Sequence, residues 1–132
     1  MTVDMQEFLK QDNWAVVGVS ADPSKYGNKV YLQLKKTGYN VYGVNPNLDS
    51  FDGDKIYPNL GALPIVPDAV SVVVPPKVTE QVVKNCIDLG IKRVWMQPGS
   101  ENEEAVRNGE EHGIDVVYNQ CVLIQTRDKI KN

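Results

Sequence analysis

The residues best suited to chemistry stand directly after the first apolar run, which begins at Trp14. Gly18 lets a ligand approach the backbone closely, Ser20 adds a hydroxyl donor, and Lys25 can reach a phosphate oxygen as a point charge. A helical pattern starts near Asn28, so the positive end of a helix dipole faces the same place. The turn therefore predicts a phosphate-binding site; the alternative is an ordinary strand–helix turn in which Ser20 bonds locally.

The end of the second apolar run bears on which nucleotide could bind. The first turn is not Gly-x-Gly-x-x-Gly, and the second run ends at Asn45 and Pro46, where NAD-binding folds usually carry an Asp or Glu for the ribose hydroxyls. No carboxylate stands there to repel a ribose phosphate. The pattern disfavours NAD and permits a nucleotide with a phosphorylated ribose, although Pro46 alone is better explained as a strand terminator.

Three further segments follow apolar runs. Val74-Pro75-Pro76 forms a stiff apolar edge that suits a flat base or an alkyl arm, and equally suits a helix start. Gln97 could read a polar arm with its amide, although on its own it is better explained by satisfying backbone groups in a turn. Cys121 could lie beside a ligand thiol, although a single cysteine is more often a small buried hydrophobe.

Strand-type and helical patterns alternate along the chain and must position these residues. A helical stretch ends at Gly38, and Ser100 with Glu103 forms a capping box that starts a later helix, which Gly113 ends. The predicted strands are residues 14–19, 39–45, 69–74, 94–96 and 115–118. The other predicted helices are 3–10, 28–37, 77–89 and a short one within 122–132, with a possible helical turn at 59–63.

This alternation predicts an α/β fold: a Rossmann-like parallel sheet of five strands in the order 3-2-1-4-5, with helices on both faces. Such sheets bind ligands outside the carboxyl ends of the strands, at the switch point beside strand one. All the segments named above stand just after strands. The fold should therefore bring them to one edge, and this convergence is the main argument from the residues for a binding site.

Composition narrows the class of protein. The chain, residues 1–132, is most simply one domain, and its net charge of −3 argues against a large nucleic-acid footprint. Cys86 and Cys121 have neither disulfide-framework nor metal-ligand spacing, and His112 joins no catalytic set. With no signal peptide or membrane-length apolar run, we expect a cytoplasmic protein, monomeric or a small homo-oligomer, that binds a small molecule.

Several short motifs occur in a characteristic order. They are Val17-Gly18-Val19-Ser20, Pro23-Ser24-Lys25-Tyr26-Gly27, Gly43-Val44-Asn45-Pro46, Val74-Pro75-Pro76, Trp95-Met96-Gln97-Pro98-Gly99 and Asn119-Gln120-Cys121. Together they resemble the small stand-alone CoA-binding proteins, which look like the N-terminal CoA-binding domain of the succinyl-CoA synthetase α subunit. The resemblance covers about residues 13–126, nearly the whole chain.

The resemblance implies that the ligand is coenzyme A or an acyl-CoA, and it implies a place for each part of that ligand. The residues expected to hold the nucleotide and pyrophosphate are Gly18, Val19, Ser20, Lys25 and Tyr26. The residues expected at the adenine edge are Val44, Asn45, Pro46, Val74, Pro75 and Val78. Those expected along the pantetheine arm are Gln97, Gly99 and Cys121.

The resemblance also implies binding without ligase chemistry, because the active-site histidine of the synthetase belongs to a later domain. Two alternatives remain. One is an NAD(P)-dependent oxidoreductase on the same fold, which the lack of an acid after the second strand and of a catalytic set disfavours. The other is a CoA or redox sensor that acts through a protein partner, with Cys121 as a thiol-exchange site.

Overall fold

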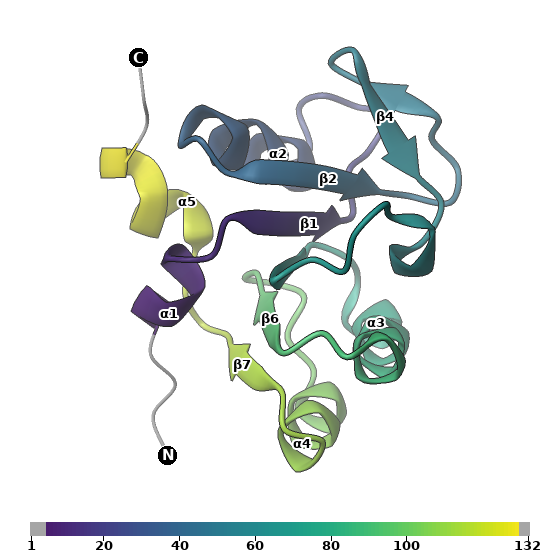
Figure 1. Cartoon of the computed structure of the whole chain (residues 1–132), viewed down its shortest axis with the longest axis vertical. Coiled ribbons are helices and arrows are strands. Elements are labelled where there is room, and N and C mark those ends of the chain that lie inside the picture. Colours follow the sequence, from purple (N-terminus) through teal and green to yellow (C-terminus); the bar gives the residue numbers. More distant parts are fainter. Residues whose placement is uncertain (1–4, 130–132) are drawn as a thin grey trace.

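The computed structural model describes residues 5–129, which form a sheet covered by helices on both faces (Figure 1). The strands are β1 (Asn13–Val17), β2 (Asn40–Val44), β3 (Ser50–Phe51), β4 (Asp54–Tyr57), β5 (Ala69–Val72), β6 (Arg93–Met96) and β7 (Asp115–Val117). The helices are α1 (Met5–Leu9), α2 (Tyr26–Lys36), α3 (Pro76–Leu89), α4 (Glu103–Glu111) and α5 (Val122–Thr126), with 3-10 turns η1 (Leu60–Ala62) and η2 (Arg127–Lys129). The expected terminal helices extended into residues 3–4 and 130–132, which lie outside the described residues.

The sheet has seven strands in the order β3-β4-β2-β1-β5-β6-β7, and every pair is parallel except β3 with β4. The predicted five-strand order is therefore wrong. The predicted third strand is β5, and it pairs with β1 instead of lying outside β2. The place beside β2 belongs to β4, so the parallel strands in chain order read 3-2-1-4-5-6, the standard order of dinucleotide-binding folds.

β4 was missed because it is short and surrounded by turn residues, while contacts from distant parts of the chain hold it in place. Ile56 is its buried residue, and a Cβ added to Gly43 of β2 would lie only 2.5 Å from the Ile56 Cδ1. At the start of the strand, the Tyr31 hydroxyl donates to Asp54 Oδ2 at 2.7 Å, and Lys35 forms an ion pair with the same carboxylate. Both partners come from α2, so tertiary contacts determine that this segment forms a strand.

The Asp54 carboxylate should make stability depend on pH. The hydrogen bond from Lys35, and then that from Tyr31, hold the pKa of Asp54 below its ordinary value of 3.8. The pKa of Asp54 is lower in the folded than in the unfolded protein. The ionised carboxylate therefore adds to the free energy of unfolding above about pH 4, and this stabilisation is lost as the pH falls through the folded-state pKa. We expect Asp54→Asn to cost less than about 1 kcal/mol at pH 7 and to flatten the acid limb of the stability profile. Urea unfolding at pH 7, 4 and 3 tests this, and a mutant profile as steep as the wild type would contradict it.

Two apolar cores form, one on each face, because successive residues of a strand point to opposite faces. On one face Trp95 packs against Trp14 and Phe8, with ring centroids 6.3 Å and 5.8 Å apart. Ala15 and Met96, the next residues along β1 and β6, join the other core, under α3 and α4. Within residues 5–129, no helix is both long enough and apolar enough to cross a membrane.

α4 begins later than expected and uses a different cap. The Asn102 Oδ1 atom accepts the Ala105 N–H at 3.0 Å and so caps the helix. Ser100, the predicted cap, is buried, and its hydroxyl accepts the Val74 N–H at 3.0 Å. The predicted capping box is therefore wrong, because Ser100 instead ties the loop after β6 to the segment after β5.

Candidate functional site

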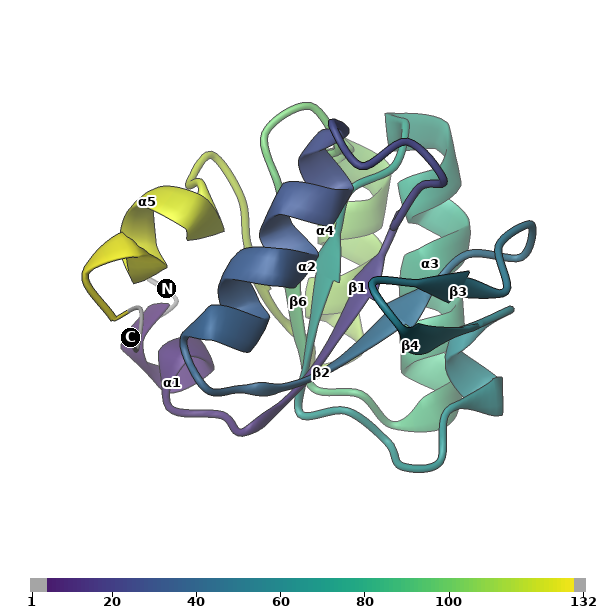
Figure 2. The same ribbon diagram turned by 90° about the horizontal axis from the view of Figure 1, so that it is seen from above.

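The switch point of the sheet lies between the neighbouring parallel strands β1 and β5. These strands lead into α2 and α3, which cover opposite faces, and the first turns of both helices stand along the same edge (Figure 2). The backbone is closely packed here. A Cβ on Gly18 would lie 1.9 Å from the Val73 carbonyl oxygen, and one on Gly27 would lie 2.2 Å from the Gly18 oxygen. The loop after β1 therefore passes directly over the end of β5, and α2 starts against that loop.

The first turn of α2 is well suited to an anion. Its N-cap is Lys25, which makes no side-chain cap hydrogen bond, and no acidic residue occurs in the first turn. The Lys25 side chain is exposed, and no carboxylate among residues 5–129 forms an ion pair with it. Unoccupied N–H groups at a helix start, together with a nearby ammonium, attract phosphate oxygens.

Asn28, in the same turn, was missed by the sequence analysis. It is fully buried, accepts the Ser20 N–H and donates to the Ser20 carbonyl oxygen, both at 2.8 Å. The Ser20 hydroxyl also accepts the Asp22 N–H at 3.1 Å, so local bonding of Ser20 does occur. The Ser24 hydroxyl, and then its N–H, donate to Asp22 and hold the pKa of that carboxyl below its usual value. Asn28 could have been recognised from the sequence, because it is a polar residue on the apolar side of the helical pattern.

The residues after β2 join that strand to the same loop. The Asn45 Nδ2 group donates to the Val19 carbonyl oxygen at 2.7 Å, and its Oδ1 accepts the Asn47 N–H at 2.8 Å. The side chains of Val19 and Val44 are buried, whereas Pro46 is exposed. The Asn45 amide is thus engaged within the protein, and no carboxylate occupies the position that usually holds a ribose in NAD-binding folds.

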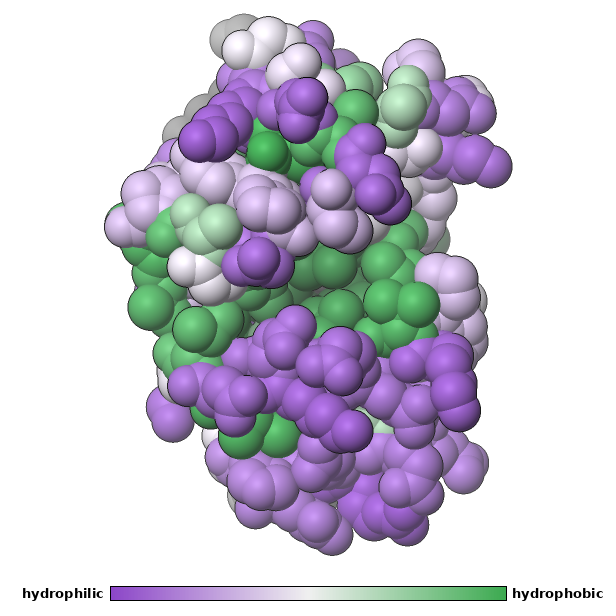
Figure 3. Space-filling view, turned by 90° about the vertical axis from the view of Figure 1, so that its right-hand side faces the viewer, coloured by the Kyte–Doolittle hydropathy of each residue, from purple (hydrophilic) through white to green (hydrophobic). Residues whose placement is uncertain are grey.

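The start of α3 presents an apolar surface at this edge. Pro75 is the N-cap without a side-chain cap bond, Val74 is half-buried, and Val78 is 45% exposed. Figure 3 shows a hollowed apolar band that crosses the side of the molecule where β4, η1 and α3 lie, with polar surface above and below it. Ile65 and Val66, in the segment before β5, are also exposed apolar side chains.

Gln97 is the centre of a buried hydrogen-bond cluster. Its Nε2 donates to the Ser71 hydroxyl at 3.0 Å, and its Oε1 accepts the Val122 N–H at 3.0 Å and the Tyr26 hydroxyl at 3.4 Å. Gln97 and Ser71 are both fully buried. The Gln97 side chain therefore joins β5, β6, α5 and α2, and its one backbone partner, the Val122 N–H, lies outside the turn after β6. The sequence contains one signal for this buried cluster that the sequence analysis overlooked, namely the hydroxyl of Ser71 within an apolar run.

Tyr26 and Cys121 meet at the same edge. Their Oη and Sγ atoms lie 2.7 Å apart, and burial and then the contact with Cys121 raise the pKa of Tyr26, so its hydroxyl stays protonated at neutral pH. Gly99 is exposed in the loop after β6, with a φ of +94°, and its N–H donates to Glu101 Oε2 at 2.9 Å. The structure thus brings the predicted residues from five separate segments to one edge, although their contact with a ligand stays a prediction.

The sequence matches the family described as "CoA binding domain" over residues 12–127. The chain belongs to the CoA-binding domain family. The α subunit of an ADP-forming acetate–CoA ligase II from Pyrococcus furiosus is a relative of this CoA-binding domain, 30% identical over 89% of the chain. An acetate–CoA ligase II from Archaeoglobus fulgidus is 29% identical over 81% of it. The chain spans only 28% and 16% of the length of these two relatives.

Solved structures agree with this membership. A hypothetical protein from Pyrococcus horikoshii matches the CoA-binding domain with a TM-score of 0.88 and 32% identity, over 94% of this chain and 87% of that one. The dinucleotide-forming acetyl-coenzyme A synthetase 1 of Candidatus Korarchaeum cryptofilum matches with a TM-score of 0.73 and 31% identity. That match covers 86% of this chain and 27% of the synthetase, so the fold occurs both by itself and within larger enzymes.

Proposed function

We propose that the protein binds coenzyme A or an acyl-CoA along the carboxyl edge of its sheet and catalyses no reaction by itself. The observation that carries the proposal is the uncapped start of α2 at the switch point, next to the exposed Lys25. Family membership supports the choice of CoA, and so does Asn45 at the position where NAD-binding folds usually have an acid.

The distribution of charge orients the ligand in this proposal. The phosphates of CoA are all in its adenosine half, whereas the pantetheine arm is neutral. Lys25 and Lys77 stand in or next to the first turns of α2 and α3. Glu101, Glu103 and Glu104 stand on the far side, after β6. The adenosine half therefore belongs between β2 and α3, with its base against Val78, and the pantetheine arm runs towards Gln97 and Cys121.

Isothermal calorimetry against CoA, acetyl-CoA, NAD and NADP in parallel tests the proposal. We expect CoA and acetyl-CoA to bind with micromolar dissociation constants and NAD and NADP to give no comparable heat. Binding of NAD or NADP alone would overturn the proposal and favour the oxidoreductase alternative. The comparison requires equal ionic strength in all four titrations, because phosphate contacts are screened by salt.

Lys25→Ala should weaken CoA binding about tenfold, through loss of a charge-assisted hydrogen bond worth about 1.5 kcal/mol or more. The matched control is Lys36→Ala, which removes the same charge from the exposed last turn of the same helix. Calorimetry should show the loss for the first variant and wild-type affinity for the second. If the two variants bind CoA equally well, Lys25 does not contact the ligand.

A further inference from the structure

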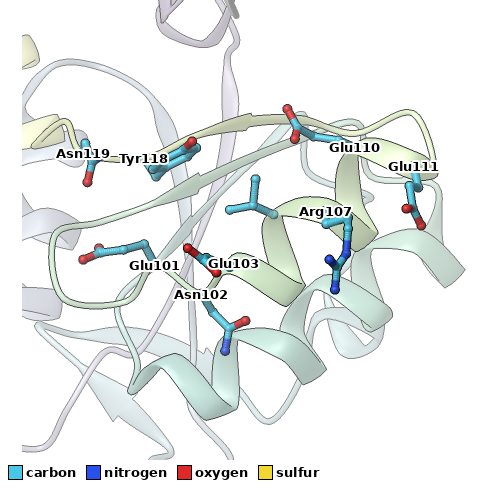
Figure 4. A pocket seen from close by; sticks show the side chains of 9 residues that line it. Glu101, Asn102, Glu103, Arg107, Glu110, Glu111, Tyr118 and Asn119 are labelled. Atoms are coloured by element: carbon cyan, nitrogen blue, oxygen red, sulfur yellow. The ribbon is translucent and has the colours of Figure 1, made fainter.

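An open groove of about 590 Å³ lies between α4 and the segment that follows β7 (Figure 4). Val106 and Tyr118 supply its apolar lining, and Tyr118 is 44% exposed. One end of the groove is bordered by Glu101 and Asn119, and α4 runs from there towards Glu110 at the other end.

The groove continues from the proposed pantetheine path on both of its walls. On one wall, Glu101 accepts the N–H of Gly99, a residue expected along that arm. On the other wall, Asn119 stands two residues before Cys121 and adopts a left-handed backbone with a φ of +62°. A group attached to the CoA sulfur would therefore leave the arm at the mouth of this groove.

The charge of the groove limits what that group can be. Its lining includes the carboxylates of Glu101, Glu103, Glu110 and Glu111, against the single guanidinium of Arg107. That guanidinium already forms an ion pair with Glu104. Within residues 5–129, no hydrogen bond or ion pair within 4.0 Å neutralises Glu103 or Glu110. A ligand carboxylate brought into this groove would meet like charge over an apolar lining, which is unfavourable.

We propose that this groove receives the acyl group of a bound acyl-CoA and selects neutral acyl chains over those that end in a carboxylate. The inference rests on the proposed function, because it takes the CoA orientation from it. The apolar lining favours an alkyl chain by burial, at about 0.8 kcal/mol for each methylene removed from water. The acidic border disfavours a dicarboxylic acyl group such as a succinyl group.

Two CoA thioethers of equal length test this without the complication of hydrolysis: S-butyl-CoA and S-(3-carboxypropyl)-CoA, with free CoA as the reference. By calorimetry at low ionic strength, we expect S-butyl-CoA to bind at least as tightly as CoA and at least fivefold more tightly than the carboxypropyl compound. Raising the salt concentration should reduce that ratio, because the repulsion is screened.

A charge-neutralising variant locates the effect. The double variant Glu103→Gln with Glu110→Gln leaves Glu101 and Glu111 charged, so it should reduce the ratio at least twofold without abolishing it, while CoA affinity stays within twofold of the wild type. Glu7→Gln, at an exposed position of α1, removes a glutamate charge outside the groove and should leave the ratio unchanged. Equal binding of both thioethers to the wild type, or tighter binding of the carboxypropyl compound, would overturn the inference while CoA binding stands. Absence of CoA binding would instead overturn the proposed function.

Discussion

Gly18→Ala is expected to destabilise the protein by about 3 kcal/mol or more. Two effects combine at this position. The backbone has a φ of +118°, which residues with a side chain rarely adopt, and the added Cβ would lie 1.9 Å from the Val73 carbonyl oxygen. That oxygen belongs to the backbone at the end of β5, so no flexible side chain can move aside. The loop after β1 must shift away from β5, and the proposed phosphate site shifts with it.

Urea unfolding measures this effect, and Gly90→Ala is the matched control. Gly90 also has a positive φ, of +76°, at the C-cap of α3, but a Cβ there would meet no atom within 4 Å. Gly90→Ala should therefore lower the free energy of unfolding only by the cost of placing alanine in a left-handed conformation, about 1–2 kcal/mol. Equal losses for the two variants would show that close packing on Val73 contributes nothing.

Gln97→Leu should cost about 3 kcal/mol of stability, a fall in Tm of roughly 10 °C, although the two side chains have similar size. The substitution removes the acceptor of the Val122 N–H and the donor to the Ser71 hydroxyl, and it leaves both groups unpaired. Buried polar groups without partners are costly, because they lose water without regaining a hydrogen bond.

The control for this variant is Gln81→Leu on the exposed surface of α3, which should change the stability by less than about 0.5 kcal/mol. Thermal unfolding of both variants, followed by CoA titration of whichever stays folded, separates two roles for Gln97. Wild-type stability with weakened CoA binding would show that Gln97 reads the ligand directly and does not act as a structural crosslink.

The positions where strands end could be found from the sequence because local signals mark them. Glycine, proline and asparagine interrupt apolar runs at Gly18, Asn45 and Pro75, and parallel strands place such interruptions at a common edge. The prediction of the ligand class depended on a resemblance carried by the same segments. The family match confirms the resemblance, and CoA binding by this chain stays a proposal.

Whether each of these side chains is available to a ligand could not be read from the sequence. Asn45 and Gln97 stand at the expected edge, yet both amides are engaged by the protein's own backbone and hydroxyl groups. Their partners, such as Val19 and Ser71, are 26 residues away in the chain. Hydrogen bonds over such separations leave no local pattern, so the sequence alone could not distinguish an engaged amide from a free one.

The sequence by itself determined the α/β alternation, the mostly parallel character of the sheet and the order of the site-forming segments, because hydrophobic periodicity and turn residues act over a few positions. Only the tertiary structure decided the sheet order and the groove beside α4. β4 lies beside β2 because Ile56 packs on Gly43 and α2 contacts Asp54, and these contacts exist only once the chain has folded. The groove likewise forms between α4 and the segment after β7, whose separate patterns give no sign that they face one another.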